Sequence, residues 1–159
     1  MWKSFAKPEQ VLITQKKNQP HNTMNKLTFT IFTIICLFLS GCDNPEKSHL
    51  ALDEGINLMF TYAQHEKAEE AFTKAIKYDG SNYEAYYYRG CSKFNRSLFK
   101  EAKEDMEKAI ELKPNYADAE FVLGRIYFVM NDRDKACEYY KAAQQHGRDN
   151  LEDYVKNCP

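Results

Sequence analysis

The sequence lacks the short motifs that mark the familiar enzymes and metal sites. Its 159 residues contain no glycine-rich phosphate loop, no GxSxG serine elbow, no HExxH and no CxxC pair. A basic excess is also missing, because residues 43–159 hold 17 Lys and Arg against 22 Asp and Glu. Nucleic-acid binding normally needs a basic face that displaces counterions from phosphates. We therefore expect no enzyme activity, no cofactor, no metal ion and no nucleic-acid partner.

Long apolar runs are scarce, and the one present is short for a transmembrane helix. It extends from Leu27 to Leu39 and contains no charged residue. A helix of this length spans about 20 Å, whereas the hydrocarbon core of a bilayer is about 30 Å thick. Because the run follows Lys26, it has the charged and apolar parts of a secretory signal. Export is therefore the favoured interpretation, and a signal anchor is the alternative.

The residues that end this run, Leu39-Ser40-Gly41-Cys42, resemble the bacterial lipobox. The resemblance implies that residues 24–41 are a lipoprotein signal peptide, cut before Cys42. It further implies that the Cys42 thiol carries a diacylglycerol and anchors the protein to the inner or outer membrane of a bacterial cell envelope. Residues 1–23 are then a leader or a misassigned start ahead of Met24, and residues 42–48 form the lipidated cysteine and a polar tether.

Three columns of residues recur at a spacing of 34. They are Ala68, Ala102 and Ala136; Phe72, Met106 and Tyr140; and Ala75, Ala109 and Ala143. This period is typical of helix–turn–helix repeats, and the pattern resembles the tetratricopeptide repeat family. The resemblance implies an all-α fold, a right-handed α-solenoid with repeats at about 49–82, 83–116 and 117–147. Residues 148–159 would add a short capping helix over the open end. Gly55 lies 35 residues before Gly90, which predicts one extra residue near Gln64.

In tetratricopeptide arrays, the first helix of each repeat lines a concave groove that holds a partner chain. Carried over to this sequence, the resemblance gives the following groove residues: Leu52, Ile56 and Met59; Tyr87, Cys91, Phe94 and Asn95; and Asp118, Phe121, Arg125 and Phe128. Aromatic side chains beside an arginine are suitable anchors for a partner, and Arg125 suits a carboxylate. The alternative is that these aromatic residues only pack in the core.

The cysteines divide into groups with different expected roles. An exported protein lies in an oxidising compartment, where structural disulfides persist. If the cap folds back along the last repeat helix, Cys137 and Cys158 come close enough for a disulfide. This arrangement, with one Cys in the last repeat helix and another near the C-terminus, resembles the ending of small bacterial repeat proteins. The alternative is two unpaired thiols. Cys91 is expected to be a small, half-buried residue without catalytic use.

Taken together, these patterns predict a membrane-tethered adaptor that binds envelope proteins through its groove and the membrane through its lipid. One alternative function is a pilotin-like assembly or secretion factor for an outer-membrane complex. Another is a docking regulator of a peptidoglycan hydrolase. A carrier of a small apolar ligand is a further alternative, although it needs a closed cavity that three repeats do not readily supply.

Overall fold

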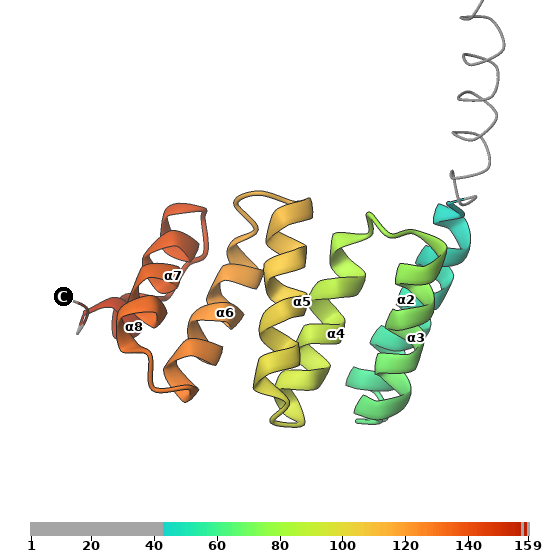
Figure 1. The fold of residues 1–159 in the computed structure, drawn as a ribbon, viewed down its shortest axis with the longest axis horizontal. Helices are drawn as coiled ribbons and strands as arrows, with labels where there is room; N and C mark the ends of the chain where they lie inside the picture. Colours follow the sequence, from blue (N-terminus) through green and yellow to red (C-terminus); the bar gives the residue numbers. More distant parts are fainter. Residues whose placement is uncertain (1–42, 157, 159) are drawn as a thin grey trace, which may run out of the picture. The chain divides into compact units, whose positions relative to one another are not determined.

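The computed structural model describes residues 43–156 and 158, and these residues form seven α-helices and no strand (Figure 1). The helices are α2 (Pro45–Phe60), α3 (His65–Tyr78), α4 (Tyr83–Asn95), α5 (Phe99–Leu112), α6 (Ala117–Val129), α7 (Arg133–Gln145) and α8 (Glu152–Val155). The predictions for residues 1–42, including lipidation of Cys42, lie outside this described part. Within it, no helix is long and apolar enough to cross a membrane.

Six of the helices pair into three hairpins, α2 with α3, α4 with α5 and α6 with α7. The hairpins stand side by side in a row, and α8 lies at the end of the row beside α7 (Figure 1). The predicted all-α architecture of three repeats and a short C-terminal helix is therefore confirmed. The turn inside the first hairpin contains residues 61–64, one more than residues 96–98 or 130–132 in the other two. This is the extra residue that the glycine spacing predicts.

Side-chain caps fix where several helices begin. Asn44, Asn82 and Asp132 each accept a hydrogen bond from a backbone N–H three residues further on, at 3.0, 3.1 and 3.2 Å. Such caps satisfy N–H groups that have no partner inside the helix. The first cap, followed by Pro45 at the first helical position, starts α2 four residues before the predicted repeat boundary at 49. Residues 45–48 are therefore helical and not a free tether.

The small residues in the repeat pattern let the two helices of each hairpin approach closely. A Cβ atom added to Gly55, Gly90 or Gly124 would lie 2.4, 2.8 or 2.7 Å from the side chain of Phe72, Met106 or Tyr140, respectively. Real Cβ atoms do not come this close to other heavy atoms, because interiors are packed at crystal-like density. The glycines and the large residues of the 34-residue columns therefore meet inside each hairpin.

A buried ion cluster adds a second link inside the middle hairpin. Asp105 of α5 is 4% exposed, and its carboxylate accepts hydrogen bonds from Arg89 at 2.6 and 2.9 Å and from Lys93 at 2.7 Å. Two cationic partners keep this carboxylate satisfied away from water. Arg89 also donates to the Thr73 hydroxyl at 3.2 Å, so the cluster connects the middle hairpin to the first.

The C-terminal segment folds back on the last hairpin. Cys137 of α7 and Cys158 form a disulfide, with their Cα atoms 5.5 Å apart. Leu151, which precedes α8, is 2% exposed and belongs to the main apolar core. The helix itself covers only residues 152–155 of the segment 148–159 in which the sequence predicts a capping helix. A helix of one turn has almost no stability alone, so the disulfide and Leu151 hold this cap in place.

Candidate functional site: the inner surface of α4 and α6

The row of hairpins bends toward the first helix of each pair. Among the described helices, the backbones of α2 and α4 come close to each other, as do those of α4 and α6, whereas the backbones of α3, α5 and α7 stay further apart. Helices that touch lie on the inner side of a bend, and helices that separate lie on the outer side. The helices α2, α4 and α6 therefore line the inner side, where the sequence predicts partner binding.

Side chains of α4 and α6 gather on this inner side, together with Tyr116 before α6 and Arg148 after α7. We call the set the α4–α6 surface, and its members are Tyr87, Cys91, Phe94, Tyr116, Asp118, Phe121, Arg125 and Arg148. The rings of Tyr87 and Tyr116 lie 5.2 Å apart and connect α4 to the start of α6. The surface thus spans the junction between the second and third hairpins.

Arg125 is the exposed cation of the surface. Its guanidinium carbon lies 4.6 Å from the ring centre of Phe94 and 5.9 Å from that of Phe121. Such stacking holds the side chain by cation–π attraction while the edge of the guanidinium keeps its N–H donors. Arg125 forms no ion pair among the described residues. The side chain is therefore positioned and still able to bind a carboxylate.

A second cation lies on the same ring from another part of the chain. The guanidinium carbon of Arg148, which follows α7, lies 4.1 Å from the ring centre of Phe121. Arg148 also forms an ion pair with Asp118 at the start of α6. Phe121 is only 8% exposed, and its ring also packs against Tyr140 and Tyr154, at 5.8 and 5.1 Å between ring centres.

The thiol of Cys91 lies among these groups and is uncharged at neutral pH. Burial raises its pKa to about 11, although a hydrogen bond with Tyr87 and the charges of Arg125 and Arg148 act to lower it. Burial likewise raises the pKa of Tyr87 above its ordinary value. A neutral, half-buried thiol is a poor nucleophile. These two residues therefore contribute polar contacts and not covalent chemistry.

The structure places the predicted groove residues in three different environments. Tyr87, Phe94 and Arg125 lie together on the α4–α6 surface, and Asn95 is exposed at the end of α4. Leu52 and Met59 do not line a surface, because they are 4% and 6% exposed in the core between the first two hairpins. This part of the prediction is wrong.

Phe121 and Phe128 also differ from the prediction. Phe121 forms the base of the α4–α6 surface under two arginines, so little of its ring is accessible. Phe128 is 54% exposed, but it lies in the last turn of α6, away from the α4–α6 surface, and lines a separate cavity at the C-terminal end. Its ring is 5.7 Å from the guanidinium carbon of Arg133.

The sequence pattern misses two members of the surface, Tyr116 and Arg148. Tyr116 immediately precedes α6, and Arg148 follows Gly147, whose φ of +96° turns the chain back after α7. Positive φ is the conformation that glycine adopts readily at the end of a helix. This glycine is the one signal in the sequence that the chain reverses here and brings Arg148 to the inner side.

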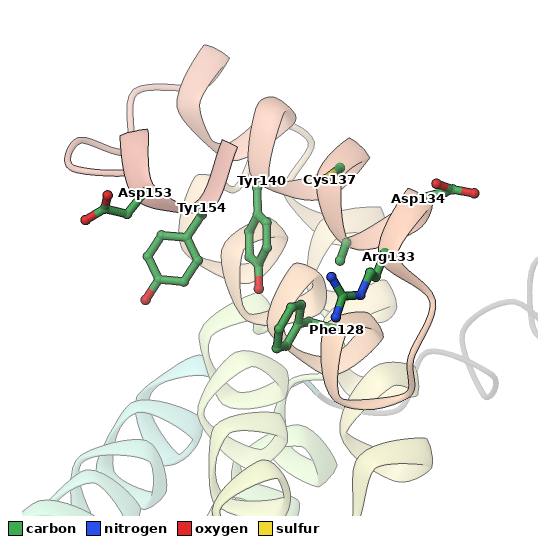
Figure 2. Close-up of a pocket in the computed structure, with 8 residues that line it drawn as sticks. Phe128, Arg133, Asp134, Cys137, Tyr140, Asp153 and Tyr154 are labelled. Carbon is green, nitrogen blue, oxygen red and sulfur yellow. The ribbon is translucent and has the colours of Figure 1, made fainter. Parts of the chain in front are cut away.

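A cavity of about 510 Å³ lies where the row of hairpins ends, beside α8 (Figure 2). The residues that line it include Phe128, Arg133, Ala136, Cys137, Tyr140 and Tyr154. The groups of the inner surface and of this cavity are suited to binding. Across the residues that the structure describes, no three His, Cys, Asp or Glu side chains cluster as metal ligands would.

Comparison with known proteins identifies the repeat. Residues 83–116 and 117–145 each match the family model described as tetratricopeptide repeat. The fold is also that of solved tetratricopeptide structures. The first such domain of Spaghetti (RPAP3), bound to the HSP90 peptide SRMEEVD, has a TM-score of 0.69 at 19% identity, over 74% of this chain and 94% of that one. Residues 83–116 and 117–145 therefore match tetratricopeptide repeats, and the described part of the chain has the fold of a tetratricopeptide solenoid.

Two further similarities involve proteins whose descriptions mention HSP90. The TPR2AB domain of yeast Sti1, solved as a complex with pHSP90, has a TM-score of 0.64 and 25% identity, over 88% of this chain and 52% of that one. Hsp70-Hsp90 organizing protein 1 of Glycine max is 29% identical over 117 residues, which cover 72% of this chain and 20% of that protein. The chain spans about a fifth of the length of the curated relatives it matches.

Proposed function

We propose that this protein is a non-catalytic adaptor that binds a segment of a partner protein on the α4–α6 surface. Arg125 carries the proposal: it is exposed, stacked between Phe94 and Phe121, and has no carboxylate partner within the described residues. An arginine held by aromatic rings loses little freedom on binding, and it pairs with a carboxylate in two hydrogen bonds. The partner segment therefore carries an acidic side chain or a free C-terminal carboxylate at this position.

The comparisons support peptide binding as the general activity. Two of the solved tetratricopeptide structures that resemble this chain hold an HSP90 peptide or partner, which supports peptide binding by a domain of this fold. Which protein supplies the segment here is a separate matter. From the lipobox at residues 39–42, we further propose that the adaptor is tethered by lipid at Cys42 in a bacterial cell envelope and that its partners are envelope proteins.

A tether increases the local concentration of the adaptor near membrane partners without adding any contact to them. Replacing Cys42 by alanine tests this part of the proposal. The variant is expected in the soluble fraction after a salt wash, whereas the unchanged protein stays with the membrane. A variant that remains in the washed membrane would show that lipid on Cys42 is not the anchor.

Partner binding is tested by photo-crosslinking in living cells. A photoreactive phenylalanine analogue replaces Phe94, and the matched control places it at Glu104, which is exposed on the outer helix α5. We expect a discrete adduct from Phe94 only, and we expect Arg125→Glu to remove it by placing a negative charge against the partner carboxylate. Equal adducts at both positions, or an adduct that survives Arg125→Glu, would contradict binding at this surface.

A further inference from the structure

The two arginines of the α4–α6 surface share one aromatic ring but differ in their pairing. The guanidinium carbons of Arg125 and Arg148 lie 5.9 and 4.1 Å from the ring centre of Phe121, so the two groups cannot be further apart than these two distances together. Arg148 forms an ion pair with Asp118, whereas Arg125 forms none among the described residues. The surface therefore presents two neighbouring cations and only one carboxylate that pairs with them.

The thiol of Cys91 lies within reach of all three charges. Burial is the main cause that raises the pKa of this thiol, and the charges of Arg125 and Arg148 act to lower it while that of Asp118 acts to raise it further. Because the interaction between charges weakens with distance, groups that act on one thiol lie near one another. The two arginines and Asp118 therefore form one electrostatic cluster where α4 meets α6.

The ion pair between Arg148 and Asp118 is exposed enough to exchange. The two side chains are 32% and 51% exposed. An ion pair in contact with water changes an equilibrium by at most about fivefold, because water competes for both charges. Arg148 does not depend on this pair for its position, since its guanidinium also stacks on Phe121. A carboxylate from another molecule can therefore replace Asp118 while the cation stays on the ring.

We propose that Arg148 is a second carboxylate-binding position, which Asp118 occupies in the free protein and which an acidic side chain of the partner segment takes over. The inference rests on the proposed binding of a first carboxylate at Arg125. In an extended segment, side chains two residues apart point to the same side, about 6.6 Å from each other. This spacing suits two cations that share one ring, so the partner segment carries two acidic residues separated by one residue.

A random heptapeptide library displayed on phage and selected on the immobilised full-length chain supplies the probe. Peptides that also bind the Arg125→Glu variant are removed. We expect the remaining peptides to carry Asp or Glu at two positions separated by one residue. Peptides with a single acidic residue would overturn this inference and leave binding at Arg125 intact. If no peptide depends on Arg125, the proposed function itself is contradicted, and this inference is overturned with it.

Fluorescence anisotropy with the selected peptide then identifies which arginine each acidic residue meets. The peptide is synthesised with a C-terminal amide, so that no terminal carboxylate contributes. Replacing its two acidic residues by their amides, one at a time, should raise the dissociation constant at least about threefold in each case. With the Arg148→Gln protein, one of these two effects should fall below about twofold. Two effects that both persist in this variant would overturn the proposal.

Removing the internal carboxylate tests the competition directly. Asp118→Asn should lower the dissociation constant of the diacidic peptide about two- to fivefold. The matched control is Asp149→Asn, which removes the same charge from an exposed neighbour of Arg148 and should change the constant less than about 1.5-fold. Adding Arg148→Gln should abolish the effect of Asp118→Asn, because nothing is left to compete for.

Equal effects of Asp118→Asn and Asp149→Asn would overturn the proposal, since a general change in charge would then explain both. The same tightening by Asp118→Asn with and without Arg148 would also overturn it. Circular dichroism checks that every variant keeps its helices.

Discussion

The disulfide between Cys137 and Cys158 should contribute about 3 kcal/mol to the free energy of unfolding. The two residues are 21 apart in sequence, and closing a loop of this size removes about 11 cal/mol/K of chain entropy from the unfolded state. The perturbation is the double variant with serine at both positions. Leu151 remains in the core and Tyr154 remains packed on Tyr140, so the native state loses few other contacts.

Equilibrium urea unfolding of the full-length chain, followed by circular dichroism, measures the change. With a slope of about 1–3 kcal/mol per molar urea, a loss of 3 kcal/mol lowers the midpoint by about 1–3 M. Unchanged protein with a reducing agent should match the double variant. The control is Cys91→Ser, which keeps the disulfide and should respond to the reducing agent as the unchanged protein does. A loss below about 1 kcal/mol, or a further shift when the double variant is reduced, would refute this reasoning.

Three further changes have expected outcomes. Asp105→Ala leaves two cations of α4 without their partner and should lower the free energy of unfolding by about 2–3 kcal/mol in urea, whereas Glu104→Ala on the exposed face should change it by less than about 0.5. Cys91 should react with iodoacetamide at pH 8 about 100 times more slowly in the folded chain than in the urea-unfolded chain, because its folded pKa of about 11 leaves less thiolate, and equal rates would contradict this pKa. Since the folded pKa exceeds the unfolded value near 9, the stability that the neutral thiol contributes should fall as pH rises from about 9 to 11. Gly124→Ala places a Cβ 2.7 Å from the Tyr140 ring and should lower the free energy of unfolding by about 1 kcal/mol in thermal melts, because the cost of overpacking exceeds the gain from the higher helix propensity of alanine. A stabilised variant would show that the hairpin can widen.

The fold could be predicted because its main determinant is periodic. Each hairpin buries the same columns, and the close contacts of Gly90 with Met106 and of Gly124 with Tyr140 repeat the spacing directly. The start of α2 was harder to predict, because the Asn44 cap and Pro45 lie outside the 34-residue pattern. Helix ends depend on such local hydrogen bonds more than on the apolar period.

The candidate site was harder to predict, because exposure depends on what the neighbouring hairpin covers. By repeat position, Leu52 and Met59 correspond to Tyr87 and Phe94, but α4 packs across them and buries them with Ala85. Repeat position therefore locates a side chain on a helix without determining how much of it the next helix covers.

The role of Arg148 depends on a relation between distant residues that no repeat column contains. It meets Asp118, 30 residues earlier in the chain, only because the chain reverses at Gly147 and the cap directs it back across α6. The same reversal places Arg148 on Phe121 from the side opposite the core. The two arginines of the inner surface thus come from a regular and an irregular part of the chain, and a change at Gly147 that prevents positive φ should displace Arg148 and leave Arg125 on Phe94.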